Sequence, residues 1–191
     1  MKTSIACAVA AVVAISIIAC KPGKTQGQSG KAETTAAVPQ DTASNSNELI
    51  ISFTMADIKG NNMSVTDEFA KHKLTIIDFW ASWCGPCRQE MPSLVKTYNE
   101  YKDKGLGIVG VSLDEDKEQW SNAVSTMGMT WTQLSDLQGW QNSATQMYGI
   151  QAIPFTIIVD STGKVLTAGL RGEELRSFIA QKLDGSSNAK Q

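Results

Sequence analysis

The sequence predicts a single α/β domain built around a mixed β-sheet, and three observations support this. Strand-like and helix-like stretches alternate through residues 49–183. The run Leu74–Trp80 is apolar on both alternating faces except at one aspartate, as expected of a central strand covered by helices on both sides. The last two strand-like runs are joined by a short turn and followed by a helix. The length of 191 residues suits one domain of ordinary size and leaves no room for a second.

Two strand-like runs at the start of the folded region predict a β-hairpin. They flank a turn-rich segment with Gly and Asn, and they lie at residues 49–55 and 63–65. A short helix is expected from Thr66, and the central strand follows it. Cys84 lies just beyond that strand.

A long amphipathic helix is expected to begin at the cysteines. After Pro86, apolar residues recur at helical spacing up to about Lys104. Proline suits the first turn of a helix, where its missing N–H costs no hydrogen bond. The pair Cys84 and Cys87 is therefore predicted at a helix N-terminus.

The remaining stretches continue the alternation of strands and helices. They are a second buried strand at 106–113, helices at 117–127 and 140–148, strands at 155–159 and 165–170, and a closing amphipathic helix at 173–183. The domain is expected to span residues 49–185, with a disordered tail at 186–191.

The N-terminal residues have the pattern of a secretory signal. Lys2 precedes an uncharged run over residues 5–19, which is shorter than the roughly 20 residues of a membrane-spanning helix. Residues 17–20 resemble the bacterial lipobox, which implies cleavage after residue 19 and a lipid on Cys20. An ordinary cleaved signal, or a short anchor with an incidental cysteine, is the alternative. Each interpretation places the domain outside the cytoplasm. The lipobox interpretation further predicts a periplasm-facing lipoprotein that is anchored to the inner or outer membrane.

The segment between the lipidation site and the domain is predicted to be a flexible tether. Residues 20–48 are mainly Gly, Ser, Thr, Gln, Ala and Lys and cannot bury enough apolar surface to fold. The formal net charge is −2, with 17 basic and 19 acidic residues scattered along the chain. This excludes the basic footprint of a nucleic-acid-binding protein. Proteins or small thiols are the expected partners.

Only two of the four cysteines remain for chemistry in the folded domain. Cys7 would leave with the signal and Cys20 would carry lipid, which leaves Cys84 and Cys87. Their short loop would add little stability as a structural disulfide. A zinc site needs about four ligands, and the chain has a single histidine, His72. No metal or organic cofactor is required.

The position of the two cysteines predicts unequal roles. The attacking species is a thiolate, and a helix N-terminus lowers the thiol pKa from about 8.5 to about 7 in a CxxC pair. Cys84 is expected at the exposed helix end as the nucleophile, and Cys87, one turn inside, as the buried resolving thiol. Asp78 is the polar exception in the central strand. Burial should raise its pKa, and it could accept the proton of Cys87. A hydrogen-bonded structural aspartate is the alternative.

Residues 78–87, with the sequence DFWASWCGPC, closely resemble the active-site strand and loop of thioredoxins. With the following RQEMP, the chain is similar to the TlpA/ResA-like branch of envelope thioredoxins. Weaker matches continue through Ile153 and Pro154 to residues 171–175, so the resemblance covers essentially the whole folded region. It implies a thioredoxin fold with an N-terminal β-hairpin extension.

The resemblance also implies roles for residues around the cysteines. Asp78 matches the buried acid six residues before the first cysteine, and Glu90 matches a functional glutamate, although an exposed helix glutamate is an almost equal alternative. A cis bond between Ile153 and Pro154 is implied, facing the cysteines and leaving the backbone of Ile153 free for a substrate chain. The remaining substrate-binding candidates are Trp83, Gly85 and Pro86, with Trp80 and Trp83 as an apolar collar.

The predicted function is dithiol-disulfide exchange. Its direction depends on redox potential, and Gly85 and Pro86 between the cysteines favour a reductase, because strongly oxidising relatives usually carry a histidine there. The expected partners are disulfide-containing envelope proteins, apocytochromes c among the candidates, and a membrane thiol electron donor. One alternative is a peroxiredoxin-like hydroperoxide reductase, which would want a threonine where Ala81 stands. The other is a non-enzymatic tethered binding module, which could dispense with both cysteines.

Overall fold

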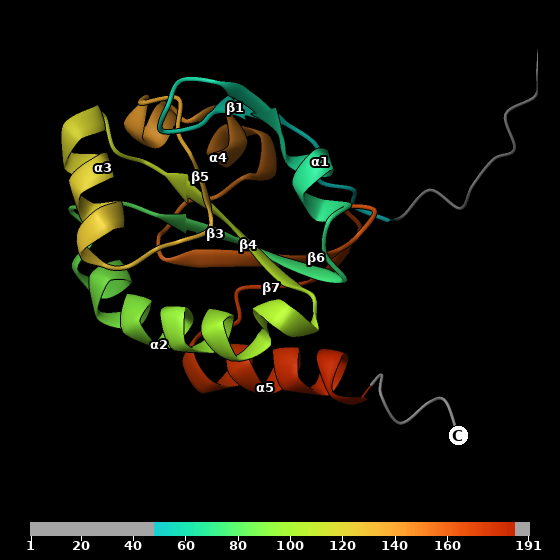
Figure 1. Cartoon of the computed structure of the whole chain (residues 1–191). Helices are drawn as coiled ribbons and strands as arrows, with labels where there is room; N and C mark the ends of the chain where they lie inside the picture. Colours follow the sequence, from blue (N-terminus) through green and yellow to red (C-terminus); the bar gives the residue numbers. More distant parts are fainter. Residues whose placement is uncertain (1–47, 186–191) are drawn as a thin grey trace, which may run out of the picture. The chain divides into compact units, whose positions relative to one another are not determined.

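The computed structural model describes residues 48–185 (Figure 1). The predicted signal peptide (1–19), the lipidation site Cys20, residues 21–47 of the tether and the tail at 186–191 lie outside the described residues. Within the described part, no helix is both long and apolar enough to cross a membrane.

A five-stranded mixed sheet forms the centre of the domain, which confirms the predicted α/β class. Its strand order is β5-β4-β3-β6-β7, and β3 pairs in parallel with β4 and antiparallel with β6. The strands are β3 (Leu74–Trp80), β4 (Leu106–Ser112), β5 (Thr132–Leu134), β6 (Phe155–Asp160) and β7 (Val165–Ala168). Every residue of β3 and β4 is buried, as expected of strands covered on both faces.

Helices lie on both sides of this sheet. Figure 1 shows α2 and α5 side by side on one face, with α1 and α4 on the other. The helices are α1 (Val65–Phe69), α2 (Gly85–Tyr101), α3 (Lys117–Thr126), α4 (Ser143–Tyr148), α5 (Gly172–Leu183) and the 3₁₀ turns η1 (Lys102–Lys104) and η2 (Gly139–Gln141). The central strand and the helix starting at the cysteines therefore lie where the sequence predicts them.

The N-terminal hairpin is confirmed but is shorter than predicted. Strands β1 (Thr54–Ala56) and β2 (Asn62–Ser64) pair antiparallel as a separate two-stranded sheet. Residues 49–51 pair elsewhere: the N–H of Ile51 donates to Gly163 O at 2.8 Å, and Leu49 O accepts the N–H of Val165 at 2.9 Å, beside the start of β7.

Two further details differ from the sequence prediction. Strand β5 was not predicted, because three residues are too few to show a periodic pattern. The single helix expected at 140–148 is divided into η2 and α4. Asn142 separates them with an extended backbone, and its side chain caps α4 by accepting hydrogen bonds from the N–H groups of Ala144 and Thr145.

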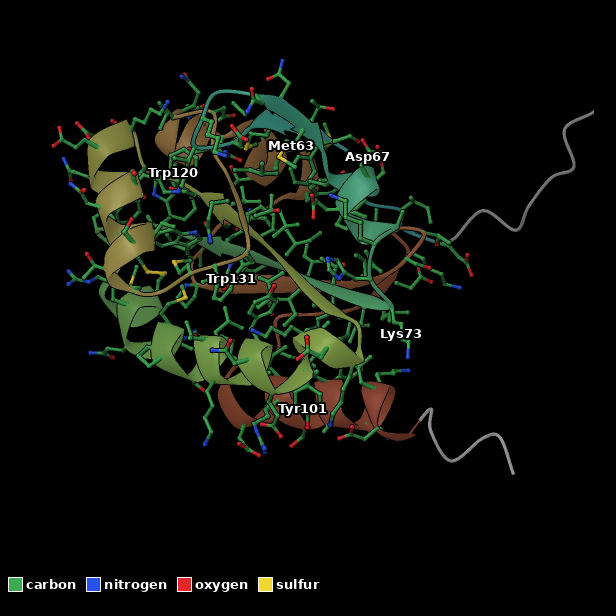
Figure 2. All side chains as sticks on the ribbon, viewed as in Figure 1. Met63, Asp67, Lys73, Tyr101, Trp120 and Trp131 are labelled. Carbon is green, nitrogen blue, oxygen red and sulfur yellow. A yellow bond between two sulfur atoms is a disulfide. The ribbon has the colours of Figure 1, made fainter. Side chains whose placement is uncertain are left out.

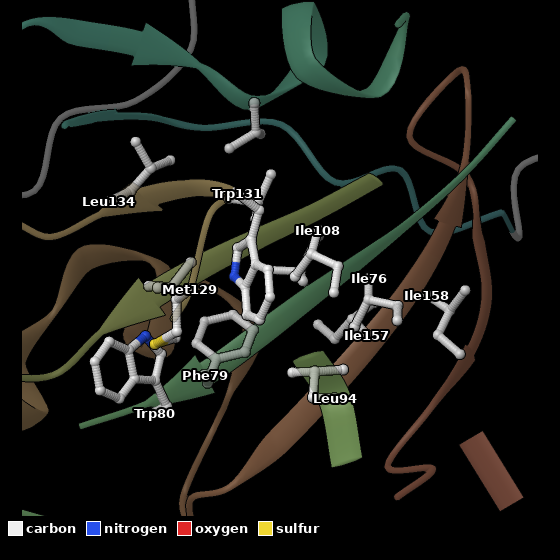
Figure 3. Packing of buried hydrophobic residues seen from close by; sticks show 14 of the residues in the cluster. Ile76, Phe79, Trp80, Leu94, Ile108, Met129, Trp131, Leu134, Ile157 and Ile158 are labelled. Carbon is white, nitrogen blue, oxygen red and sulfur yellow. The ribbon is translucent and has the colours of Figure 1, made fainter. Parts of the chain in front are cut away.

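Aromatic and branched side chains fill the space between the helices and the sheet. Figure 2 labels Trp120, on α3, and Trp131, just before β5, and both are buried. Figure 3 labels Leu94 of α2 together with Ile76 of β3, and both belong to this buried cluster. Because side chains alternate along a strand, Asp78 points to the same face as Ile76, toward α2.

Candidate active site: a cysteine pair at the start of helix α2

A disulfide joins Cys84 and Cys87 at the N-terminus of α2, with an S–S distance of 2.04 Å. Cys84 is the N-cap residue, and its Sγ accepts a hydrogen bond from the backbone N–H of Cys87 at 3.2 Å. Pro86 occupies the first turn, as predicted. The helix terminus therefore directs an N–H group and its partial positive charge toward the sulfur of Cys84.

The expectation that Cys84 is exposed is wrong for this disulfide form. Cys84 is only 5% exposed and Cys87 2%. The sulfur of Cys84 is bonded to that of Cys87 and accepts the N–H of Cys87, so it is directed toward the helix instead of toward water. The neighbouring Gly85 and Pro86 are exposed and form the accessible surface of the motif.

Trp83 and Trp80 do not form a collar around the cysteines together. Trp83 is exposed, whereas Trp80 is fully buried and donates its indole N–H to Gln133 Oε1 at 3.1 Å. The prediction for Trp80 is corrected because its position at the end of a central strand directs it into the core.

A buried carboxylate that the sequence analysis missed anchors the loop before Cys84. Asp114 accepts hydrogen bonds from the backbone N–H of Ser82, at 3.0 Å to Oδ2, and from the Ser82 hydroxyl at 2.6 Å. The hydroxyl of Ser112 donates to the same carboxylate at 2.6 Å. These contacts fix the loop between β3 and α2. Only the position of Asp114 just after a buried strand could have indicated this role.

Asp78 lies behind the cysteines with a strongly raised pKa. Burial raises the pKa of its carboxyl to about 7, the nearby Glu90 carboxylate adds to the increase, and Arg171 opposes it. Its Oδ2 atom is buried and has no hydrogen-bond partner among the described residues. The predicted direction of the pKa change is confirmed.

A small cavity connects Asp78 with Cys87. It has a volume of about 20 Å³, room for about one water molecule. Glu90 and Pro154 also line it, so four of the sequence-predicted site residues meet there. A water in this cavity would lie between the thiol of Cys87 and the carboxyl of Asp78.

Glu90 is held in place by the start of α5, so it is not a free surface glutamate. Its Oε2 accepts a hydrogen bond from Arg171 Nε at 2.8 Å, and its Oε1 accepts the backbone N–H of Gly172 at 2.9 Å. These contacts tie the first turns of α2 and α5 together beside the cavity. Arg171 was not singled out from the sequence because its partner lies 81 residues away.

The peptide bond between Ile153 and Pro154 is cis, as the resemblance implied. Pro154 borders the cavity that Cys87 also lines. The pairing of β6 with β3 begins at Phe155, so Ile153 lies outside the strand ladder. Its backbone remains a predicted contact for a substrate chain.

Comparisons with known proteins agree with this geometry. A family model described as Redoxin matches residues 36–182. The thioredoxin-like protein YneN of Bacillus subtilis is 33% identical over 135 residues, which cover 69% of this chain and 75% of that protein. Thiol-disulfide oxidoreductase ResA of Bacillus thuringiensis is 28% identical over 131 residues, covering 69% and 72%.

Solved structures of similar proteins share the fold. The thioredoxin domain of a thiol-disulfide oxidoreductase from Bacteroides vulgatus superposes with a TM-score of 0.65 at 35% identity, covering 73% of this chain and 99% of that one. A thiol-disulfide oxidoreductase from Bacteroides fragilis gives a TM-score of 0.64 at 30% identity, covering 69% and 97%.

Proposed function

Because this chain belongs to the redoxin family and is a thiol-disulfide oxidoreductase of thioredoxin-like fold, we propose that it reduces disulfides in cell-envelope proteins. The observation that carries the proposal is the Cys84–Cys87 disulfide at the N-terminus of α2. It shows that the two sulfurs are placed to form and break a bond with each other, which a two-cysteine exchange reaction requires.

In the proposed reaction, the Cys84 thiolate attacks one sulfur of a substrate disulfide. A mixed disulfide forms, and the other substrate sulfur leaves as a thiolate. The thiolate of Cys87 then attacks Cys84 Sγ, which releases the second substrate sulfur and closes the Cys84–Cys87 bridge. Two electrons pass from the dithiol to the substrate, and a membrane thiol donor would return them.

Asp78 is the proposed proton acceptor for Cys87. A carboxyl with a pKa of about 7 can take a proton at neutral pH and return it when the bridge is reduced again. The cavity between the two residues offers room for one water to carry that proton. Glu90 has a positioning role in this scheme, because it joins α2 to α5 beside the same cavity.

Insulin reduction tests the proposed function directly. We expect the protein, with dithiothreitol as electron donor, to speed the precipitation of insulin chains well above the rate with dithiothreitol alone. A parallel hydroperoxide assay tests the peroxidase alternative, in which buried Ala81 would stand in place of the threonine. Activity on hydroperoxide without activity on insulin would reject the proposal, and inactivity in both assays would favour a binding module.

The proposed location is the periplasmic side of the cell envelope. The lipobox-like residues 17–20 support a lipid on Cys20, and residues 20–48 would tether the domain at 49–185 to the inner or outer membrane. Envelope proteins with disulfides are the proposed substrates, with apocytochromes c one candidate group.

Replacing Cys20 with alanine should change both the processing of the protein and its membrane fractionation. The variant would lack the thiol that receives the lipid, so we expect loss of signal processing and a change in membrane fractionation, measured by immunoblotting of cell fractions. Replacement of Cys7 by alanine is the matched control. Unchanged processing and fractionation of the Cys20→Ala variant would disprove the anchor.

A further inference from the structure

Two of the five tryptophans lie at the surface, and they contact each other. Trp83 is 51% exposed and Trp140 41%, whereas the other three are buried. The ring centroids of the exposed pair are 6.5 Å apart, with the planes tilted by 53°. This is the spacing of interacting aromatic side chains. Large apolar side chains that lie together at the surface beside a reactive residue are a feature of binding sites.

The backbone before Trp83 is held firmly. Ser82, its neighbour in sequence, binds the buried carboxylate of Asp114 through both its N–H group and its hydroxyl. Cys84, on the other side, begins helix α2. The Trp83 ring therefore extends from a short loop that is fixed at both ends.

The segment carrying Trp140 is equally constrained. The carbonyl of Trp140 accepts a hydrogen bond from Gln146 Nε2 at 2.8 Å. Buried Asn142 donates its side-chain N–H to Asp136 Oδ1 at 2.8 Å and caps α4. Leu137 has a φ of 58°, the left-handed region that residues with a side chain rarely adopt. A loop fixed in an unfavourable backbone conformation, with its tryptophan in water, is typical of a functional site.

We propose that Trp83 and Trp140 form an aromatic platform that binds a large apolar side chain next to the cysteine of a substrate disulfide. This rests on the proposed function and names its substrate class. Trp83 is the residue before Cys84 and its ring contacts that of Trp140, so both rings belong to the surface next to the nucleophile. Consecutive Cα atoms are about 3.8 Å apart, so the side chains that flank the substrate cysteine are brought near Trp83, which flanks Cys84.

The occupant that fits this platform is an unfolded or extended polypeptide. In a folded protein, aromatic and long aliphatic side chains beside a disulfide are mostly buried and cannot reach two surface rings. Along the chain, the segment that carries Trp140 continues through α4 to Ile153, the predicted contact for the substrate backbone. The platform would select unfolded substrates over folded ones.

Two matched disulfide peptides test the platform. They have equal length and charge and differ only in Phe or Ala beside the cysteine, and bis(2-hydroxyethyl) disulfide serves as a substrate without side chains. We expect the reduced protein to show a kcat/KM about tenfold higher for the Phe peptide, the usual scale of a tryptophan contact at an interface. The Trp140→Ala variant should lose that preference while its rates on the Ala peptide and the small disulfide change less than about twofold.

Two further variants separate the platform from a general effect. Trp140→Phe keeps an aromatic ring and should retain most of the preference. Ile50→Ala removes another exposed apolar side chain, at the end of the sheet away from the cysteines, and should behave as the native protein. An unchanged preference in Trp140→Ala, or an equal loss on all three substrates, would overturn the platform alone. If the native protein reduces none of the three disulfides, the proposed function fails as well.

Discussion

Replacing Asp78 with asparagine should stabilise the oxidised protein at high pH. The difference between the usual carboxyl pKa of 3.8 and its raised value of about 7 corresponds to about 4 kcal/mol of unfavourable free energy when the buried group is ionised. Asparagine has nearly the same shape and carries no charge, so it removes this penalty. We expect the variant to gain about 2 to 4 kcal/mol in the free energy of unfolding at about pH 8, because burying the amide offsets part of the gain.

The pH dependence distinguishes this cause from a change in packing. Between about pH 4 and pH 7, the native protein holds a proton on Asp78 that the unfolded chain has lost, so native stability decreases as the pH rises through this window. The variant lacks this contribution. The difference in stability between the two proteins should therefore grow across the window and stay constant above about pH 7.

Urea unfolding of both oxidised proteins at several pH values measures this difference. Asp114→Asn is a matched control, because Asp114 is also buried but its two carboxylate oxygens accept from three donors and asparagine has only one acceptor oxygen, so that variant should be destabilised. Asp78→Asn should at the same time slow insulin reduction about 100-fold near neutral pH, the usual contribution of a general base. Parallel stability curves for native protein and Asp78→Asn would contradict a raised pKa, and unchanged turnover would remove Asp78 from the mechanism.

The sequence was most informative where local pattern and site coincide. The bounds of β3, Leu74–Trp80, were predicted correctly because the run is apolar on both alternating faces with a single charged exception. That exception, Asp78, is also the residue with the raised pKa. A charged residue in the middle of an apolar run can be recognised from the sequence alone. The free-energy cost of burying its charge predicts that its pKa is raised.

Features that depend on distant contacts could not be predicted in this way. Glu90 and Arg171 are 81 residues apart, and nothing in the helical pattern around Glu90 indicates that α5 begins beside it. Asp114 reaches Ser82 across 32 residues. The contact between Trp83 and Trp140 likewise requires the loop after β5 to return to the cysteines. Cys84 is buried because its sulfur is bonded to that of Cys87, and the spacing of the two cysteines in the sequence does not predict the direction of this bond.

The unequal roles of the two cysteines give the second large effect. If Cys84 attacks and Cys87 resolves, a Cys87→Ala variant can form the mixed disulfide with a substrate but has no internal thiol to release it. The mixed disulfide should still form, because the attacking thiol at the helix N-terminus is unchanged, and it should persist because the resolving thiol is missing. A Cys84→Ala variant lacks that attacking thiol and should form few such bonds.

The measurement that tests the account most directly is therefore the capture of these adducts in the protein's own host. Each variant is expressed, free thiols are blocked, and adducts are separated on non-reducing gels and identified by mass spectrometry. We expect Cys87→Ala to accumulate adducts with disulfide-containing envelope proteins that disappear on reduction, and Cys84→Ala to accumulate few. Adducts on Cys84→Ala instead, or none on either folded variant, would contradict the assignment of Cys84 as the nucleophile of a disulfide reductase.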